Sequence, residues 1–180
     1  MIEAEAISDD EAEAALRAVL GDDLGHLART LVEETDEDVA IDENSNLFAV
    51  IQNMTVMQKI KLARMGNKEA RGLLVRDRNK IVAISAISSP KVNVQEVATI
   101  AKARNVSDEV LRVIAAKREW TRDYQVKLAL CANPKCPRPT AVKFVNYLQD
   151  RDLKALMRSK DVPTAIATHA RRILMKKGKV

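Results

Sequence analysis

A succession of short segments, each with its own helix start signal, constrains this chain more than any other feature of its sequence. The opening residues are of the types preferred at helix N-caps: Ser8, Thr55, Asn67, Asn79, Asn93 and Ser107. The segments expected to be helical are 9–20, 56–65, 68–77, 80–89, 94–104, 108–120, 121–132, 139–149, 150–160 and 163–176. The aliphatic run at 80–87 is the one place where a strand could compete. Helices of about a dozen residues are marginal alone in water, so each must pack on a neighbour, which predicts an all-α fold.

Charge divides the chain into two parts. Residues 1–50 contain 15 Asp and Glu against two Arg, whereas residues 51–180 contain 28 Lys and Arg against ten acids. The net charge of +5 therefore combines a charge of −13 with one of +18. We predict an acidic N-terminal arm over 1–46, partly helical or disordered, and a basic helical-repeat domain over 47–180. Leu24, Leu27, Leu31 and Val32 suggest a second short helix in the arm, and 33–46 a solvated linker.

Several classes of protein are disfavoured by composition. No stretch approaches the roughly 20 apolar residues of a membrane span, and the N-terminal residues are acidic where a secretory signal is basic. Two cysteines make no disulfide framework. We therefore expect a cytoplasmic protein.

The sequence aligns with itself at two offsets. A shift of 44 residues places 83–101 on 127–145, and a shift of 56 places 100–110 on 156–166. In the first alignment Ser89-Pro90-Lys91 falls on Asn133-Pro134-Lys135. The unequal offsets indicate repeat units of unequal length.

The segment Ala132-Asn133-Pro134-Lys135-Cys136-Pro137, between two apolar helices, resembles the leucine-rich repeat variant and, more loosely, HEAT-like α-solenoids. The other unit has Ser-Ser-Pro in place of the Asn-Pro motif. Residues 55–176 also resemble a group of bacterial proteins that share the run KIKLARMGNKEARGLLVRDRNK. The repeat resemblance implies a short right-handed α-solenoid of helical pairs across about 47–176, a fold suited to binding partners.

Cys131 and Cys136 form the one motif that invites a catalytic reading. A structural zinc site needs four ligands, and a thioredoxin-like site needs two residues between its cysteines rather than four. The repeat alignment places Cys131 opposite Ile87 and Cys136 opposite Val92. Core packing is therefore the favoured interpretation, with metal or redox chemistry as the alternative.

The remaining residues offer little for catalysis. His26 and His169 have no partner at a spacing typical of a catalytic group, and the five glycines form no phosphate-binding loop. We predict that the protein is not an enzyme and that it has no catalytic, metal-binding or cofactor-binding residues.

Basic residues give the strongest functional signal. We predict that a partner binds at three clusters: Arg71, Arg76, Arg78 and Lys80; Arg118, Trp120 and Arg122; and Arg151, Lys154 and Arg158. A simpler interpretation of the cations is that they are ordinary solvated side chains on the outside of helices. A simpler interpretation of Trp120 is that it fills a gap in the core between repeats of unequal length.

These clusters predict a non-catalytic protein-binding or scaffolding module whose partner carries an acidic surface. Nucleic-acid backbone binding is the alternative, although few aromatic residues are present to stack on bases. The acidic arm is expected either to regulate binding by covering the basic face or only to aid solubility.

Overall fold

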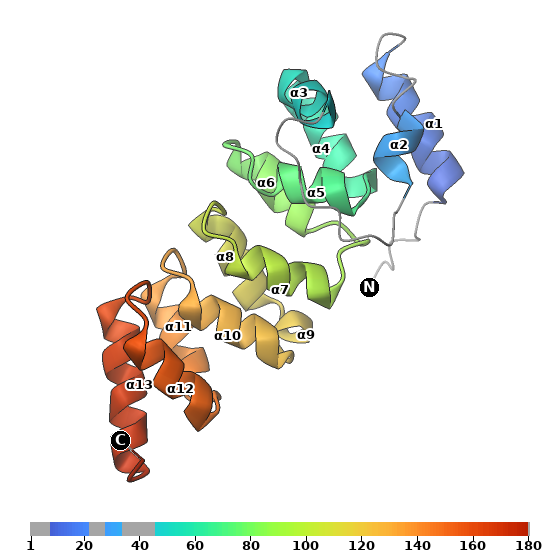
Figure 1. The fold of residues 1–180 in the computed structure, drawn as a ribbon. Coiled ribbons are helices and arrows are strands. Elements are labelled where there is room, and N and C mark those ends of the chain that lie inside the picture. The colour runs from blue at the N-terminus through green and yellow to red at the C-terminus, as the bar shows by residue number, and fades with distance from the viewer. Residues whose placement is uncertain (1–7, 22–27, 34–45, 180) are drawn as a thin grey trace. The chain divides into compact units, whose positions relative to one another are not determined.

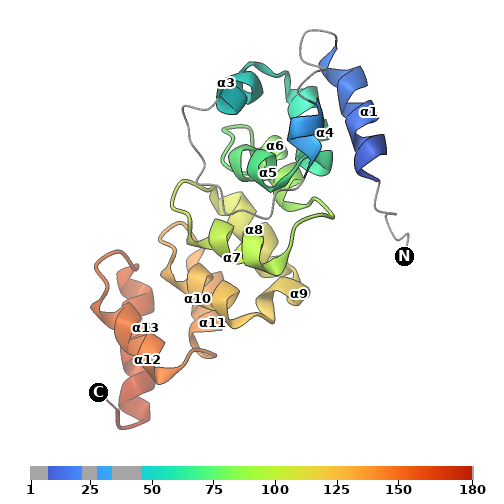
Figure 2. The same cartoon turned by 45° about the vertical axis from the view of Figure 1, so that its right-hand side comes forward.

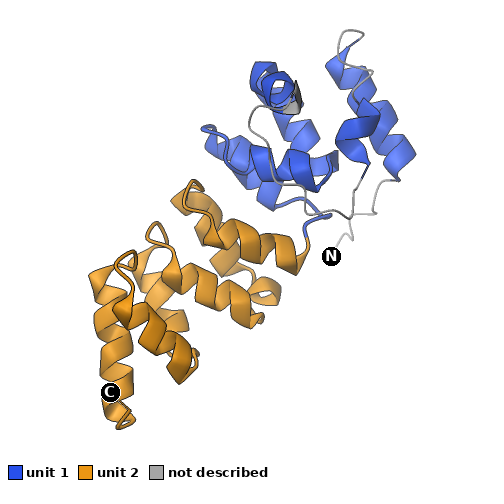
Figure 3. Ribbon diagram, viewed as in Figure 1, with its two compact units in different colours: residues 1–92 blue, residues 93–180 orange. Residues whose placement is uncertain are grey.

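The fold was obtained as a computed structural model that describes residues 8–21, 28–33 and 46–179 (Figure 1). Every regular element in these ranges is a helix, which confirms the predicted all-α class. The chain forms two compact units, unit 1 (Met1–Val92) and unit 2 (Asn93–Val180) (Figure 3). The boundary predicted at residue 46 separates an acidic segment of the sequence from a basic one, and it stays a prediction. The predicted linker lies almost wholly outside the described residues.

Unit 1 is built around α4, which packs against α1, α5 and α6, while α1 also packs against α2. The helices of unit 1 are α1 (Asp9–Leu20), α2 (Ala28–Val32), α3 (Asn46–Asn53), α4 (Val56–Met65), α5 (Lys68–Leu74) and α6 (Lys80–Ile87). Its core includes Leu16, Leu31, Leu62, Leu74 and Ile87, all fully buried.

Unit 2 is a series of packed helices in which α10 contacts α7 and α11, and α13 contacts α11 and α12. Its helices are α7 (Val94–Lys102), α8 (Asp108–Ala116), α9 (Arg118–Thr121), α10 (Tyr124–Ala132), α11 (Arg138–Val145), α12 (Asp150–Arg158) and α13 (Thr164–Lys176). Figures 1 and 2 both show α12 lying beside α13 at the C-terminal end of the chain. None of the described helices is long and apolar enough to cross a membrane.

Helix starts follow the local rules that the sequence suggested. The hydroxyl of Ser8 accepts a hydrogen bond from Glu11 N at 3.3 Å, and the Glu11 carboxylate accepts one from Ser8 N at 3.2 Å. Thr55 and Gln58 form the same reciprocal capping box. The other predicted caps each bond a backbone amide in the first turn: Asn67, Asn79, Asn93 and Ser107. All six predicted caps are confirmed.

One helix was not predicted, and one predicted helix is interrupted. Helix α3 was not expected, and the helix expected over 108–120 breaks at Lys117, whose ψ of 111° is extended. At 100° per residue, a continuous helix would place Trp120 on the side opposite Leu111. The break instead allows both residues to be buried. Tertiary packing of the tryptophan therefore overrides the helical propensity of the segment.

Buried polar side chains tie non-consecutive helices together in both units. In each case a side chain that follows one helix donates hydrogen bonds to carbonyl oxygens at the C-terminal end of another, where backbone acceptors lack helical partners. The bonds run from Asn67 Nδ2 to Thr30 O (2.9 Å) and Glu33 O (3.1 Å), from Ser89 Oγ to Arg64 O (3.0 Å), and from Asn133 Nδ2 to Ala101 O (2.8 Å) and Ala103 O (3.0 Å).

Helix starts recur at the offsets found in the sequence. The first residues of α6 and α10, and those of α7 and α11, are 44 residues apart, whereas those of α8 and α13 are 56 apart. Ile87 and Cys131, which the 44-residue shift pairs, are both fully buried. The aligned segments thus have helices that begin at corresponding residues.

Candidate functional site

Helix α12 separates its apolar and cationic residues onto opposite sides. Its sequence DRDLKALMR buries Leu153 and Leu156, and α13 packs against the helix. Arg151, Lys154 and Arg158 are exposed at positions i, i+3 and i+7, so they share one side of the helix. Together with Asp150 and Ala155 they line a shallow hollow. We call Arg151, Lys154, Ala155 and Arg158 the α12 face.

Nearby acids are already bound to other groups. Asp150 accepts hydrogen bonds from Lys177 Nζ at 2.8 Å and from Lys179 Nζ at 2.5 Å. These two bonds lower the pKa of Asp150 to about 2. Asp161 forms a two-pronged ion pair with Arg104, at 2.7 and 3.3 Å, and the same bond raises the pKa of Arg104.

The third acid, Asp152, points toward α10. It accepts a hydrogen bond from the hydroxyl of Tyr124, which in turn accepts one from Gln149 N at 3.0 Å. Burial first, and then the bond to Asp152, raise the pKa of Tyr124, so this hydroxyl keeps its proton at neutral pH. Asp152 is therefore held by a neutral donor.

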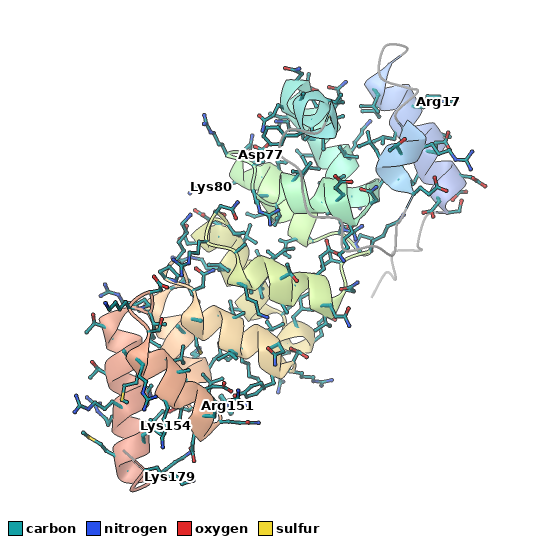
Figure 4. All side chains as sticks on the ribbon, viewed as in Figure 1. Arg17, Asp77, Lys80, Arg151, Lys154 and Lys179 are labelled. Atoms are coloured by element: carbon teal, nitrogen blue, oxygen red, sulfur yellow. The ribbon has the colours of Figure 1, made fainter. Side chains whose placement is uncertain are left out.

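The cations of the α12 face stay without a carboxylate. Among the described residues, neither Arg151, Lys154 nor Arg158 forms an ion pair. Figure 4 labels Arg151 and Lys154 on α12, with Lys179 near the C-terminal end of the chain. Lys177 and Lys179 hold Asp150, and Tyr124 holds Asp152, so both acids next to Arg151 in sequence are engaged elsewhere. The result is an uncompensated positive surface on a regular helix.

The predicted cluster in unit 1 divides into buried and exposed residues. Arg71 is only 2% exposed, and its Nη1 donates to Gly66 O at 2.8 Å, so its guanidinium is part of the core of unit 1. Arg76 is half-buried and bonds Gly72 O. Arg78 and Lys80 are exposed. The residues of this cluster therefore share no single exposed surface.

Trp120 is also buried, at 4% exposure, whereas Arg118 and Arg122 on either side of it are exposed. The ammonium of Lys117 lies 3.9 Å from the centre of the indole ring, a cation–π contact. The aromatic surface that would anchor a partner is thus covered by the protein itself, which agrees with the packing interpretation. Arg118 and Arg122 remain as exposed cations beside it.

Both cysteines are buried and free, as the repeat alignment predicted. Burial raises the pKa of Cys131 to about 12 and that of Cys136 to about 11, so both are neutral thiols at physiological pH. His169 Nε2 lies 3.2 Å from Asn146 Oδ1, while His26 lies outside the described residues. Within the described ranges, no group of three or more His, Cys, Asp or Glu is arranged to hold a metal ion.

Sequence reasoning missed the partners that leave the α12 face unbalanced. Lys177 and Lys179 are 27 and 29 residues from Asp150, and Asp161 is 57 residues from Arg104. No spacing rule links residues that far apart. The position of Ala155 beside the cations was predictable from the sequence, because it is four residues after Arg151 and so lies on the same side of the helix.

Comparison of the chain with protein families, with curated proteins and with solved structures finds no match.

Proposed function

We propose that this protein is a non-catalytic binding module that holds an acidic protein partner on the α12 face. The observation that carries the proposal is the group of exposed cations Arg151, Lys154 and Arg158, which have no ion pair among the described residues while the neighbouring acids are occupied. Unit 2 as a whole contains 19 Lys and Arg against eight Asp and Glu, a net charge of +11 with His neutral. Such a field favours encounter with anionic partners.

The geometry of the α12 face indicates the kind of acidic partner. Arg158 is seven positions after Arg151, which is about 10 Å along a helix. Ala155 lies among the cations and allows another backbone to approach closely. A helix with carboxylates at positions i, i+3 and i+7 has the same spacing, so an acidic helix is the fitting partner.

The helical pairs are proposed to stack as a short right-handed α-solenoid. The recurrence of helix starts at offsets of 44 and 56 residues supports this arrangement, as do the polar side chains that join one helix end to another within each unit. Solenoids expose broad surfaces made of helix faces, which suits them to binding proteins.

The proposal is tested with a fluorescein-labelled helical peptide that carries Glu at positions i, i+3 and i+7, by anisotropy in about 50 mM salt. Replacing Arg151, Lys154 and Arg158 with alanine is expected to weaken binding by about tenfold or more. The matched control replaces Arg171, Arg172 and Lys176, three exposed cations on α13, and removes the same charge. It should change affinity by less than about twofold.

An equal loss of peptide affinity in both triple variants would show that the peptide responds only to the net charge of the protein, which would contradict the proposal. A duplex DNA probe is measured in parallel. Binding that is tighter to the duplex than to the peptide, and that falls steeply as salt rises, would identify nucleic-acid backbone binding in place of a protein partner.

A further inference from the structure

Helix α1 has an acidic surface whose pattern matches that of the α12 face. Its buried residues are Ala12, Leu16 and Leu20. On the other side, Asp10, Glu13, Ala14 and Arg17 line a shallow hollow. We call these four residues the α1 face.

Salt bridges hold the α1 face in position. Asp9, next to it, pairs with Lys91 at 2.6 Å and ties the start of the helix to the rest of unit 1. Glu13 lies 3.4 Å from Arg17, one helical turn away, so these two side chains lie together on the surface. Among the described residues, Asp10 forms no ion pair.

The two faces have the same spacing and largely opposite charge. Each has a charged residue at its first, fourth and eighth positions and an alanine at its fifth. On α12 all three charges are positive, whereas on α1 the first two are negative and the third is Arg17. Figure 4 labels Arg17 on α1 and both Arg151 and Lys154 on α12. The match extends over about two helical turns.

We propose that the α1 face of one copy of this chain binds the α12 face of a second copy. This inference rests on the proposed function, because it names the acidic helix that the α12 face receives. An antiparallel register places Asp10 against Arg158 and Glu13 against Lys154.

The same register brings the two alanines, Ala14 and Ala155, together at the centre of the contact. It also places Arg17 against Arg151, a pair of like charges. A parallel arrangement would place Asp10 against Arg151, Glu13 against Lys154 and Arg17 against Arg158. Arg17 therefore meets an arginine in either direction, and the attraction between the two faces comes from Asp10 and Glu13.

A contact between two different faces does not close on itself. Each copy keeps a free α12 face when its α1 face is bound, so association continues into a ring or an open chain of copies. The interface consists of two helix surfaces with exposed ion pairs, so it is weak, transient and sensitive to salt.

The test is sedimentation velocity on the full chain at about 10 to 500 µM protein, in about 50 mM and about 500 mM NaCl. Mass is expected to rise with concentration at low salt and to return to the monomer at high salt. Two charge-reversed variants are then made, Lys154→Glu with Arg158→Glu, and Asp10→Lys with Glu13→Lys. Each alone is expected to associate at least about tenfold more weakly.

An equimolar mixture of the two variants is the decisive sample. In the mixture, the acidic α1 face of the first variant meets the basic α12 face of the second, and the reversed faces also match. Association should return to within about threefold of the wild-type chain. The matched control, Arg171→Glu with Arg172→Glu, changes two exposed arginines of α13 and should associate as the wild type does.

Three results would overturn the inference: a monomer at every concentration in low salt, variants that associate as the wild type does, or no recovery in the mixture. Circular dichroism checks that each variant stays helical. The milder pair Asp10→Asn with Glu13→Gln replaces the lysine variant if α1 unfolds, and it should weaken association about threefold or more. The acidic peptide is titrated in the same samples. Peptide binding by a strictly monomeric chain would overturn self-association alone, whereas loss of both would also overturn the proposed function.

Discussion

Replacing Asn133 with alanine tests whether buried side chains hold the helices of unit 2 together. Asn133 is 3% exposed and uses both ends of its amide. Its Nδ2 donates to Ala101 O at 2.8 Å and to Ala103 O at 3.0 Å, at the end of α7. Its Oδ1 accepts from Lys135 N at 3.0 Å. Alanine removes all three bonds and takes this donor from the buried carbonyl group of Ala101 and the half-buried one of Ala103.

The expected loss follows from these three bonds. A protein hydrogen bond contributes about 0.5 to 1.5 kcal/mol net, and a buried group left unsatisfied loses its full hydration energy. Together these effects predict a decrease of about 3 kcal/mol in the free energy of unfolding of unit 2. Asn133→Asp should lose nearly as much, because its carboxylate keeps the bond from Lys135 N but faces two carbonyl oxygens.

Urea unfolding followed by tryptophan fluorescence measures this loss directly. Trp120 is the only tryptophan of the chain and is buried in unit 2, so its emission reports on that unit. The matched control is Asn146→Ala, an exposed asparagine whose Nδ2 donates to Val142 O at 3.4 Å and whose Oδ1 lies 3.2 Å from the exposed His169 Nε2. This change should alter the free energy of unfolding by less than about 0.5 kcal/mol. A loss below about 1 kcal/mol for Asn133→Ala would refute the reasoning, since water would then be replacing the side chain.

Two further predictions follow from the pKa shifts. The thiols of Cys131 and Cys136, with pKa values raised by burial to about 12 and about 11, should react with a thiol reagent at pH 8 only when urea unfolds the chain, and fast labelling of the native protein would contradict their burial. Lys177 and Lys179 lower the pKa of Asp150 to about 2. Their ion pairs with Asp150 therefore stabilise the folded state fully above the ordinary carboxyl pKa of about 3.9, and this stabilisation is lost as pH falls toward 2. Replacing both lysines with alanine should return that pKa to about 3.9 in a carboxyl NMR titration, and an unchanged value would show that another group lowers it.

Local sequence was enough to predict most of the helices. Capping residues act within one turn, so Ser8 and Thr55 could be recognised from three neighbouring positions, and both caps form as expected. The break at Lys117 could not be recognised in this way. It depends on the burial of Trp120, which is a property of the packed unit rather than of the segment.

The candidate site was predictable only in part. Helical periodicity places Arg151, Lys154 and Arg158 on one side of α12, because three side chains at i, i+3 and i+7 share a face whatever the helix packs against. The sequence analysis also grouped Arg71 with the cations expected to bind a partner. The fold instead buries Arg71 and bonds its guanidinium to Gly66 O.

By itself, then, the sequence determined the helical class, the starts of the helices and the sidedness of α12, because these depend on residues at most a few positions apart. Only the tertiary structure decided which charges stay uncompensated. Lys177 and Lys179 reach Asp150 from the far end of α13, and Tyr124 reaches Asp152 from α10. Residues that far apart in the chain meet only when their helices pack, so packing is what leaves the α12 face positive.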